Sequence, residues 1–455
     1  MSKLGQTETL RILRMGQAGE GVSEDAEGRV VFVQGALPGE VVKAEITEVR
    51  NSFSRAKTQQ IDRATPDRII PRCPIADDCG GCVFQHWDYA AELEYKEHRV
   101  RQALIRIGRL ENPKVGLIQG AKEPYGYRNK GQFPWGGSVG QAYLGLYARK
   151  SHKVVATTHC DIQDVVVNRV LERMPTIVNR LQISPYDETS GRGVLRHLLV
   201  RTNGQGKALV LFIVRAWDDR LRLAADRIMA EVPGVVGVGA NLNAANTNRV
   251  LGSRTQLLRG QSSIMESVLG AQFNLSFESF FQVNPGQLGR LYGLVLDALD
   301  EAATPLDTVW DLYAGVGTLA ILAAGRAKAV RAVELSPEAV RDAWANIALN
   351  HVQNVTMTVG RAEHIILDWV RSTALPPSAV IVDPPRAGLT PEVVEALLDL
   401  KSPTLIYVSC NPETLARDVS LMAQTYDLAH AQPVDMFPRT DHVETVAVLR
   451  RHERR

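Results

Sequence analysis

The chain has 455 residues, of which 45% are hydrophobic and 22% are charged, a composition that fits two or three globular domains and excludes a largely disordered protein. Lysine and arginine outnumber aspartate and glutamate by only 52 to 50, so the net charge of +2 excludes a uniformly basic surface, and any binding of nucleic acid must depend on local patches. No apolar run approaches the roughly 20 residues of a membrane span, and the first residues lack a signal-peptide core, which together predict a cytoplasmic protein without a membrane partner.

The first 65 residues alternate apolar and polar side chains in short runs that turns separate. Two such runs cover residues 30–33 and 41–46, and Pro38-Gly39 marks a turn between them. The pattern predicts a small antiparallel barrel. A basic stretch overlaps its end and continues beyond it, with Arg50, Arg55, Lys57, Arg63, Arg68 and Arg72. This part of the chain resembles the TRAM domain, a small barrel that binds RNA.

The five cysteines divide into a set of four and a single one, Cys410. Cys73, Cys79 and Cys82 lie within ten polar, glycine-rich residues, and the distant Cys160 can complete a set of four ligands. Disulfides are disfavoured in a reducing cytosol, whereas four thiolates suit a [4Fe-4S] cluster or a structural zinc ion. Buried small apolar side chains are the alternative interpretation, but the polar surroundings fit it poorly. We therefore expect a metal site.

The middle of the chain, residues 66–270, is predicted to form an α+β domain around these cysteines. Residues 89–109 have the periodicity of an amphipathic, basic helix, which we expect to pack on the catalytic domain. Residues 124–153 contain no acidic side chain, and their basic residues interleave with aromatic ones. This mixture suits phosphate contact and base stacking, although a β-rich surface over an aromatic core gives the same composition. Further on, residues 209–214 are predicted as a strand and residues 218–230 as a helix.

From about residue 271 to the end, strands alternate with helices. This order predicts an α/β fold with a doubly wound, mostly parallel sheet. The predicted strands cover residues 308–312, 329–334, 379–383 and 404–409, and the predicted helices cover residues 317–324, 337–349, 391–398 and 414–423. The expected domains are therefore 1–65, 66–270 and 271–455.

A glycine turn and an acidic residue predict a cofactor pocket at the carboxyl edge of this sheet. Gly315-Val316-Gly317 follows the first strand, where backbone can approach a ligand closely. One such turn is weak evidence by itself, but Glu334 ends the next strand, where a carboxylate can accept both hydroxyls of a ribose. The turn is typical of S-adenosylmethionine pockets.

Two further strands end in residues with reactive groups. Asp383 precedes two prolines that fix the turn, so its carboxylate is expected to face the pocket, although a turn-capping role is the alternative. Arg386 stands where amino-group methyltransferases carry a stacking aromatic residue, which disfavours methylation of an exocyclic amine. The thiol of Cys410 ends an apolar strand, a position in which it can react, and a nearby sulfonium is expected to lower its pKa.

Five segments in consecutive order carry a family resemblance: FQVNPGQ at 281–287, DLYAGVGTLAI at 311–321, VDPPRAGL at 382–389, YVSCNPETLARD at 407–418 and FPRTDHVETVAVL at 437–449. Together they resemble the S-adenosylmethionine-dependent RNA uracil-5-methyltransferases. The barrel and the four cysteines extend the resemblance over nearly the whole chain, and they are similar to those of the branch that acts on 23S rRNA. Departures are Ala314 and Thr318, where relatives carry cysteine and asparagine.

The resemblance implies a Rossmann-like methyltransferase domain, S-adenosylmethionine as cofactor and a [4Fe-4S] cluster in the central domain. It implies Cys410 as the nucleophile and Glu444 as the base. Carbon 5 of uracil is a poor nucleophile until a thiolate adds to carbon 6, which explains why this chemistry needs a thiol and a base. The residues implied to contact the cofactor are Gln282, Tyr313, Glu334 and Asp383, and those implied to hold the cluster are Cys73, Cys79, Cys82 and Cys160.

The implied function is methylation of carbon 5 of a uridine, with 23S rRNA preferred as substrate and a monomer expected. Three alternatives stay open from the sequence. The same chemistry can act on tRNA, a related thiol enzyme can act on carbon 5 of cytosine, and a non-catalytic iron-sulfur protein can bind RNA or assist assembly. Intact Cys410, Asp383 and Glu444 disfavour the last alternative.

Overall fold

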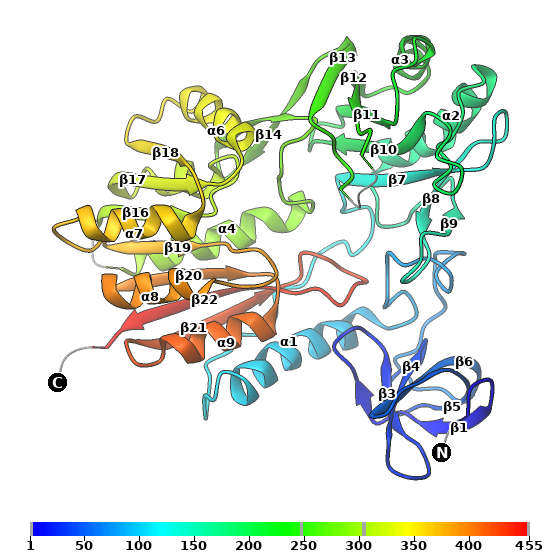
Figure 1. Ribbon diagram of the computed structural model, residues 1–455. Helices are drawn as coiled ribbons and strands as arrows, with labels where there is room; N and C mark the ends of the chain where they lie inside the picture. Colours follow the sequence, from blue (N-terminus) through cyan, green and yellow to red (C-terminus); the bar gives the residue numbers. More distant parts are fainter. Residues whose placement is uncertain (1–2, 246–248, 303–305, 453–455) are drawn as a thin grey trace. The chain divides into compact units, whose positions relative to one another are not determined.

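The computed structural model describes residues 3–245, 249–302 and 306–452, which include every predicted site residue. The chain divides into two compact units (Figure 1). Unit 1 comprises Met1–Arg99, Tyr147–Val155 and Phe437–His442, and unit 2 comprises Val100–Leu146, Ala156–Met436 and Val443–Arg455. The three-domain division predicted from the sequence stays a prediction. Among the described helices, none combines the length and apolar character needed to cross a membrane.

Unit 1 contains the predicted N-terminal barrel-like sheet. Its six strands follow the order β1-β5-β6-β4-β3-β2. Alternate residues of β5, including Val42, Ala44 and Ile46, are buried in one core cluster, as the period of a strand with one covered face requires. One pair departs from the antiparallel expectation, because β4 runs parallel to β6. The strands are β1 (Thr7–Arg11), β2 (Arg14–Met15), β3 (Gly21–Glu24), β4 (Val30–Gln34), β5 (Val41–Val49) and β6 (Phe53–Arg63).

The predicted basic helix forms as α1 (Tyr89–Arg106), three residues shorter than expected. Within unit 1, Glu92 and Lys96 form a buried ion pair of 2.7 Å on this helix, and Arg439 lies 3.6 Å from the same carboxylate. Within unit 2, Val100 and Leu104 belong to the hydrophobic cluster of the C-terminal sheet. Of the lysines and arginines of α1, Lys96 is buried, Arg99 and Arg101 are half-buried, and Arg106 is exposed.

Most of the central sheet belongs to unit 2. The sheet is mixed and has seven strands in the order β13-β12-β11-β10-β7-β8-β9, of which the last residue of β8 and the first two residues of β9 are assigned to unit 1. Every residue of β11 is buried, which agrees with the apolar run that predicted it. The elements are β7 (Lys130–Gly136), β8 (Tyr143–Tyr147), β9 (Val154–Ala156), α2 (Val165–Arg180), β10 (Leu195–Thr202), β11 (Ala208–Val214), α3 (Arg220–Glu231), β12 (Val235–Leu242) and β13 (Arg254–Gly260), followed by the hairpin of β14 (Ser263–Val268) and β15 (Ala271–Ser276).

The C-terminal part of unit 2 confirms the doubly wound sheet, with the order β18-β17-β16-β19-β20-β22-β21. The first five strands pair in parallel, whereas β22 is antiparallel to both of its neighbours. The strands are β16 (Leu306–Leu312), β17 (Ala327–Glu334), β18 (Val355–Val359), β19 (Ala379–Val382), β20 (Thr404–Ser409), β21 (Tyr426–Val434) and β22 (Glu444–Arg451). The helices are α4 (Pro285–Asp300), α5 (Thr318–Ala323), α6 (Pro337–Leu349), α7 (Ala362–Ser372), α8 (Pro391–Leu400) and α9 (Pro412–Met422).

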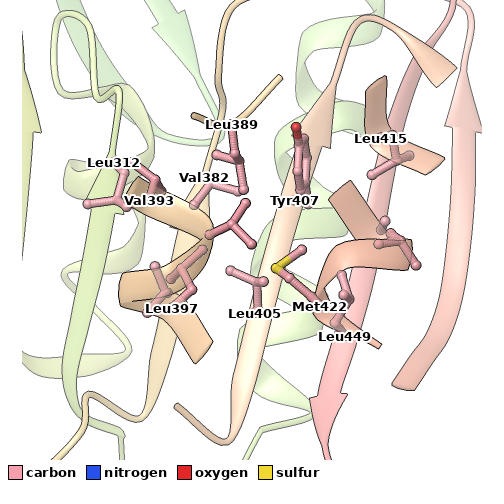
Figure 2. Close-up of a cluster of buried hydrophobic side chains, with 14 of the residues drawn as sticks. Leu312, Val382, Leu389, Val393, Leu397, Leu405, Tyr407, Leu415, Met422 and Leu449 are labelled. Carbon is pink, nitrogen blue, oxygen red and sulfur yellow. The ribbon is translucent and has the colours of Figure 1, made fainter. Parts of the chain in front are cut away.

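One hydrophobic cluster fixes the central strands of this sheet. Figure 2 shows Leu397 and Met422, which lie on α8 and α9, packed close to strand residues such as Leu405 and Leu449. Burial of each such side chain stabilises the fold by roughly 1.5–3 kcal/mol. The cluster therefore holds the strand ends, and the residues that follow them, in fixed positions.

Candidate active site

The strand order brings three predicted site residues to one edge of the sheet. Asp383 follows the last residue of β19, and Cys410 follows the last residue of β20. Because β22 is antiparallel to β20, with Ser409 opposite Thr445, its first residue, Glu444, lies at this same edge. Neighbouring strands are about 4.8 Å apart, so the three groups gather around one site at the carboxyl ends of the parallel strands.

The thiol of Cys410 lies between a fully buried strand and a capped helix. All six residues of β20 are buried, and the Asn411 side chain accepts a hydrogen bond of 3.1 Å from the Glu413 amide at the start of α9. Burial raises the pKa of Cys410 to about 11, and the neighbouring Glu444 adds to this rise while Arg386 opposes it. The protein by itself therefore keeps the thiol protonated, so the predicted lowering of its pKa depends on the positive cofactor.

Both carboxyl groups at this edge hold their protons more tightly than ordinary acids. Glu444 is 3% exposed, and its Oε2 has no hydrogen-bond partner in the part of the chain that the structure describes. Burial, with Asp383 as a second cause, raises the pKa of Glu444 to about 8. Burial also raises the pKa of the half-buried Asp383 to about 7. Values near neutrality suit a group that must gain and lose a proton during a reaction.

The glycine turn and Glu334 are joined by hydrogen bonds. The Gly315 amide donates to Oε2 of Glu334 at 3.0 Å, and the Ser336 amide donates to Oε1 at 2.8 Å. The carboxylate is thereby fixed at the end of β17, and each oxygen keeps a lone pair that a ribose hydroxyl can use. Gly317 has a φ of 80°, a left-handed conformation that favours glycine.

Gln282 lies in the FQVN segment, which belongs to unit 2 like the other residues of this edge. Gln282 is 8% exposed. The segment is anchored by Asn284, whose side chain caps α4 and donates to the Met436 carbonyl at 3.1 Å. The backbone around Gln282 is therefore held in place.

Tyr313 can contact a cofactor with its ring but not with its backbone amide. Its backbone amide donates to the Val333 carbonyl at 3.0 Å, so this donor is already used. The ring packs against the hydrophobic cluster beneath the sheet edge, and the residue has a φ of 69°. The ring face is therefore the part of Tyr313 that remains for a cofactor.

Two residues beside this edge were not predicted as site residues. Asp311 is fully buried in β16, and neither of its carboxylate oxygens has a hydrogen-bond partner among the described residues. Burial, followed by the nearby Asp383, raises its pKa well above the ordinary value. Tyr292 on α4 is also buried and lies close enough for Asp383 and Glu444 to raise its pKa. A charged residue inside the apolar run Val309-Trp-Asp-Leu312 is the sequence signal that could have identified Asp311.

The four candidate metal ligands are distributed over both units. Cys73, Cys79 and Cys82 belong to unit 1, and Cys160 belongs to unit 2. In residues 3–245, 249–302 and 306–452, no group of three or more His, Cys, Asp or Glu side chains is arranged to hold a metal ion. Four thiols suit an iron-sulfur cluster chemically. The cluster stays a prediction, and no reaction step depends on it.

The family model for tRNA (Uracil-5-)-methyltransferase matches residues 88–452. The chain belongs to this RNA uracil-5-methyltransferase family. The TRAM domain model matches residues 1–58, which are the barrel-like sheet of unit 1. The protein is therefore an S-adenosylmethionine-dependent RNA uracil-5-methyltransferase, with RNA as its class of substrate.

Similar proteins span the whole chain. An uncharacterized RNA methyltransferase of Listeria monocytogenes is 39% identical over 98% of this chain and 97% of its own length. One of Halalkalibacterium halodurans is 38% identical over 98% and 97%. Among solved structures, the Pyrococcus abyssi tRNA (uracil-54, C5)-methyltransferase with S-adenosyl-L-homocysteine is 24% identical, covers 98% of this chain and 100% of that one, and has a TM-score of 0.75. This likeness shows the same fold.

Proposed function

We propose that this uracil-5-methyltransferase acts through a covalent adduct in which the sulfur of Cys410 is bonded to carbon 6 of the target uracil, and that Glu444 resolves this adduct. The observation that supports the proposal best is the meeting of Cys410, Asp383 and Glu444 at one sheet edge, where both carboxyl groups raise the pKa of Cys410 and Asp383 raises the pKa of Glu444. A thiol and a carboxyl group that exchanges its proton near neutrality are the two groups that this chemistry requires.

In the first step, the Cys410 thiol gives its proton to water and its sulfur bonds to carbon 6 of uracil. The electron pair of the ring double bond moves toward the carbonyl at carbon 4 and makes carbon 5 nucleophilic. S-adenosylmethionine supplies the electrophilic methyl group that carbon 5 takes up. The Glu444 carboxylate then accepts the proton of carbon 5, the double bond reforms, and the bond from sulfur to carbon 6 breaks. The products are 5-methyluridine, S-adenosylhomocysteine and the Cys410 thiolate, which takes up the proton that Glu444 holds and becomes a thiol again.

The remaining predicted residues would hold the cofactor. Glu334 would accept the ribose hydroxyls, since its carboxylate is fixed by two backbone amides. Gln282 would hydrogen-bond the methionine moiety with its side-chain amide, and the Tyr313 ring would line the pocket. Asp383 would lie near the transferred group, where the positive sulfonium would favour its charged form.

We further propose 23S rRNA as the substrate, because the TRAM sheet and the four-cysteine set resemble the ribosomal branch. The name of the matching family model and the Pyrococcus abyssi structure favour tRNA as the second candidate. A [4Fe-4S] cluster on Cys73, Cys79, Cys82 and Cys160, a monomeric state, a cytoplasmic location and the domain limits 1–65, 66–270 and 271–455 complete the proposal.

The test uses RNA that carries tritium at carbon 5 of its uracil bases, incubated with S-adenosylmethionine that carries a radiocarbon methyl group. Methylation at carbon 5 should release one tritium into water for each methyl group transferred, and Cys410→Ala should abolish both while still binding the cofactor. Methyl transfer without tritium release would contradict the proposed target atom. Separate incubations with 23S rRNA and tRNA identify the substrate, and label on cytosine or no transfer to either RNA would overturn the proposal.

A further inference from the structure

Positive side chains lie directly opposite each other on two strands of the central sheet. Lys130 on β7 pairs with Arg201 on β10 in the antiparallel register. Arg128 precedes Lys130 by two residues, donates from its Nε to the Lys130 carbonyl at 3.0 Å and is close enough to lower the pKa of Lys130. Like charges at directly opposed positions destabilise a sheet. An arrangement of this kind needs an explanation.

The cationic cluster, defined as Arg128, Lys130 and Arg201, is only partly offset by protein carboxylates. Among the described residues, none of the three forms an ion pair with a carboxylate, although Asp342 and Glu266 lie near enough to influence Arg201. Arg201 is fully buried, one of its terminal nitrogens donates to the Ser279 carbonyl, and its Nε has no partner. A buried charge without a partner is costly, so the cluster is destabilising unless an anion joins it.

The pKa and the exposure of Lys130 are those expected of a lysine that binds an anion. Burial, together with Arg201 and Arg128, lowers the pKa of Lys130 to about 7. The residue is nevertheless only half-buried, so a ligand can reach it from solvent. An incoming negative charge would restore the charged form of the amine.

The cluster lies beside the segment that carries Gln282. Arg201 donates to the carbonyl of Ser279, three residues before Gln282. Directly before the neighbouring strand β7, the Asn129 amide donates to the carbonyl of Val283 at 2.9 Å. These backbone contacts join the cationic face of the central sheet to the segment proposed to contact the cofactor.

We propose that the cationic cluster binds a backbone phosphate of the RNA substrate, close to the nucleotide that is methylated. The inference rests on the proposed function and adds a specific phosphate site to it. The guanidinium of Arg128 and the ammonium of Lys130, both half-buried, can contact oxygens of one phosphate, while the fully buried Arg201 adds positive charge behind them. Such contacts position the RNA without reading its sequence. The surrounding segment, residues 124–153, has no acidic side chain that would repel a phosphate.

The test compares Lys130→Gln with wild type in RNA binding at several salt concentrations. Loss of one phosphate contact should weaken binding roughly tenfold at moderate salt and lower the slope of log Kd against log salt by about 0.7 to 1. Lys130→Arg should restore both. The matched control is Lys328→Gln, an exposed lysine at the amino end of β17, which should change neither.

Two further measurements separate a ligand site from a structural role. Because Lys130→Gln removes a repulsion, it should raise the Tm while it weakens RNA binding, whereas a structural lysine would lower the Tm when replaced. The Kd for S-adenosylhomocysteine should stay unchanged. An unchanged salt slope, a lower Tm, or a loss confined to S-adenosylhomocysteine binding would each overturn the phosphate site. If the wild-type protein methylates no RNA, the proposed function fails instead.

Discussion

Among single residues, Glu444 and Asp383 determine the pH range of methyl transfer through the protonation of their carboxyl groups. With pKa values of about 8 and about 7, both are protonated at mildly acidic pH, and a protonated carboxyl cannot accept the proton of carbon 5. Because the two groups interact, the measured pKa belongs to the pair.

The first prediction is therefore a rise in kcat/KM with pH up to about 8, with a loss approaching tenfold for each unit below the apparent pKa. The rate rises with pH because the pKa of each carboxyl group is raised, whereas an ordinary glutamate would leave the rate unchanged above about pH 5. Initial methylation rates from about pH 5.5 to 9 at subsaturating RNA measure this dependence. A flat profile between pH 6 and 8 would show that neither carboxyl limits the reaction.

The second prediction concerns the base alone. Glu444→Gln preserves the size of the side chain but removes its ability to take the carbon 5 proton, so the methylated adduct should accumulate. A protein-RNA band that resists denaturation on a gel, labelled by the methyl group, would reveal it. The control is the double variant with Cys410→Ala, in which the band should vanish. Normal turnover without any band would remove Glu444 from the mechanism.

At the scale of elements, helix α9 fixes the loop that follows Asp383. Asp418 is fully buried, and its Oδ2 accepts hydrogen bonds of 2.8 Å from the Leu389 amide and from the Tyr407 hydroxyl. Two more contacts reach Arg386, whose carbonyl accepts hydrogen bonds from the side chains of Asn411 and Thr414. The strand that carries Cys410 and the loop after β19 are thus held by one helix.

The third prediction is that Asp418→Ala lowers the free energy of unfolding by about 2–4 kcal/mol, because it leaves a buried amide and a buried hydroxyl without acceptors. The rate of methyl transfer should fall as well, since the loop after Asp383 loses an anchor. Denaturant unfolding measures the first effect. The matched control, Asp399→Ala at an exposed position of α8, should change stability by less than about 0.5 kcal/mol.

The elements that sequence alone predicted are those with a local signal. Strand β20 and helix α6 begin and end where predicted, because an apolar run and a serine cap with a following proline mark them. Helices α4 and α7 and strand β18 were not predicted. Strand β18 is an edge strand of the described sheet, where it pairs with β17. Its residues Thr356 and Val359 are exposed, so it lacks the continuous apolar run of a central strand.

Some residues of the candidate site could likewise be selected from a local sequence signal, and others could not. Strand-end position was enough to select Asp383, Cys410 and Glu334, because parallel strands bring their carboxyl ends together. Glu444 was found only through the family resemblance, since it begins an antiparallel strand and no local pattern assigns it to this edge. The pairing of Lys130 with Arg201 depends on a register between strands far apart in the sequence, and composition cannot reveal it.

Over the chain as a whole, the TRAM sheet and the residues proposed for methyl transfer belong to different compact units. The TRAM sheet and three of the four candidate cluster cysteines belong to unit 1, whereas the residues proposed for methyl transfer belong to unit 2. Unit 2 has its own hydrophobic cluster beneath the catalytic edge. Loss of a metal would therefore leave cofactor binding intact.

The fourth prediction follows from this separation. Protein purified without oxygen should contain about four iron atoms and inorganic sulfide per chain, with visible charge-transfer absorbance. Cys79→Ser should lose most of the iron and bind RNA less tightly, yet keep the wild-type Kd for S-adenosylhomocysteine. Cys410→Ser is the matched control, because it changes the one cysteine outside the set of four and should keep all the iron. One zinc ion per chain in place of iron would make the site a structural zinc site, and the absence of both metals would contradict a metal site altogether.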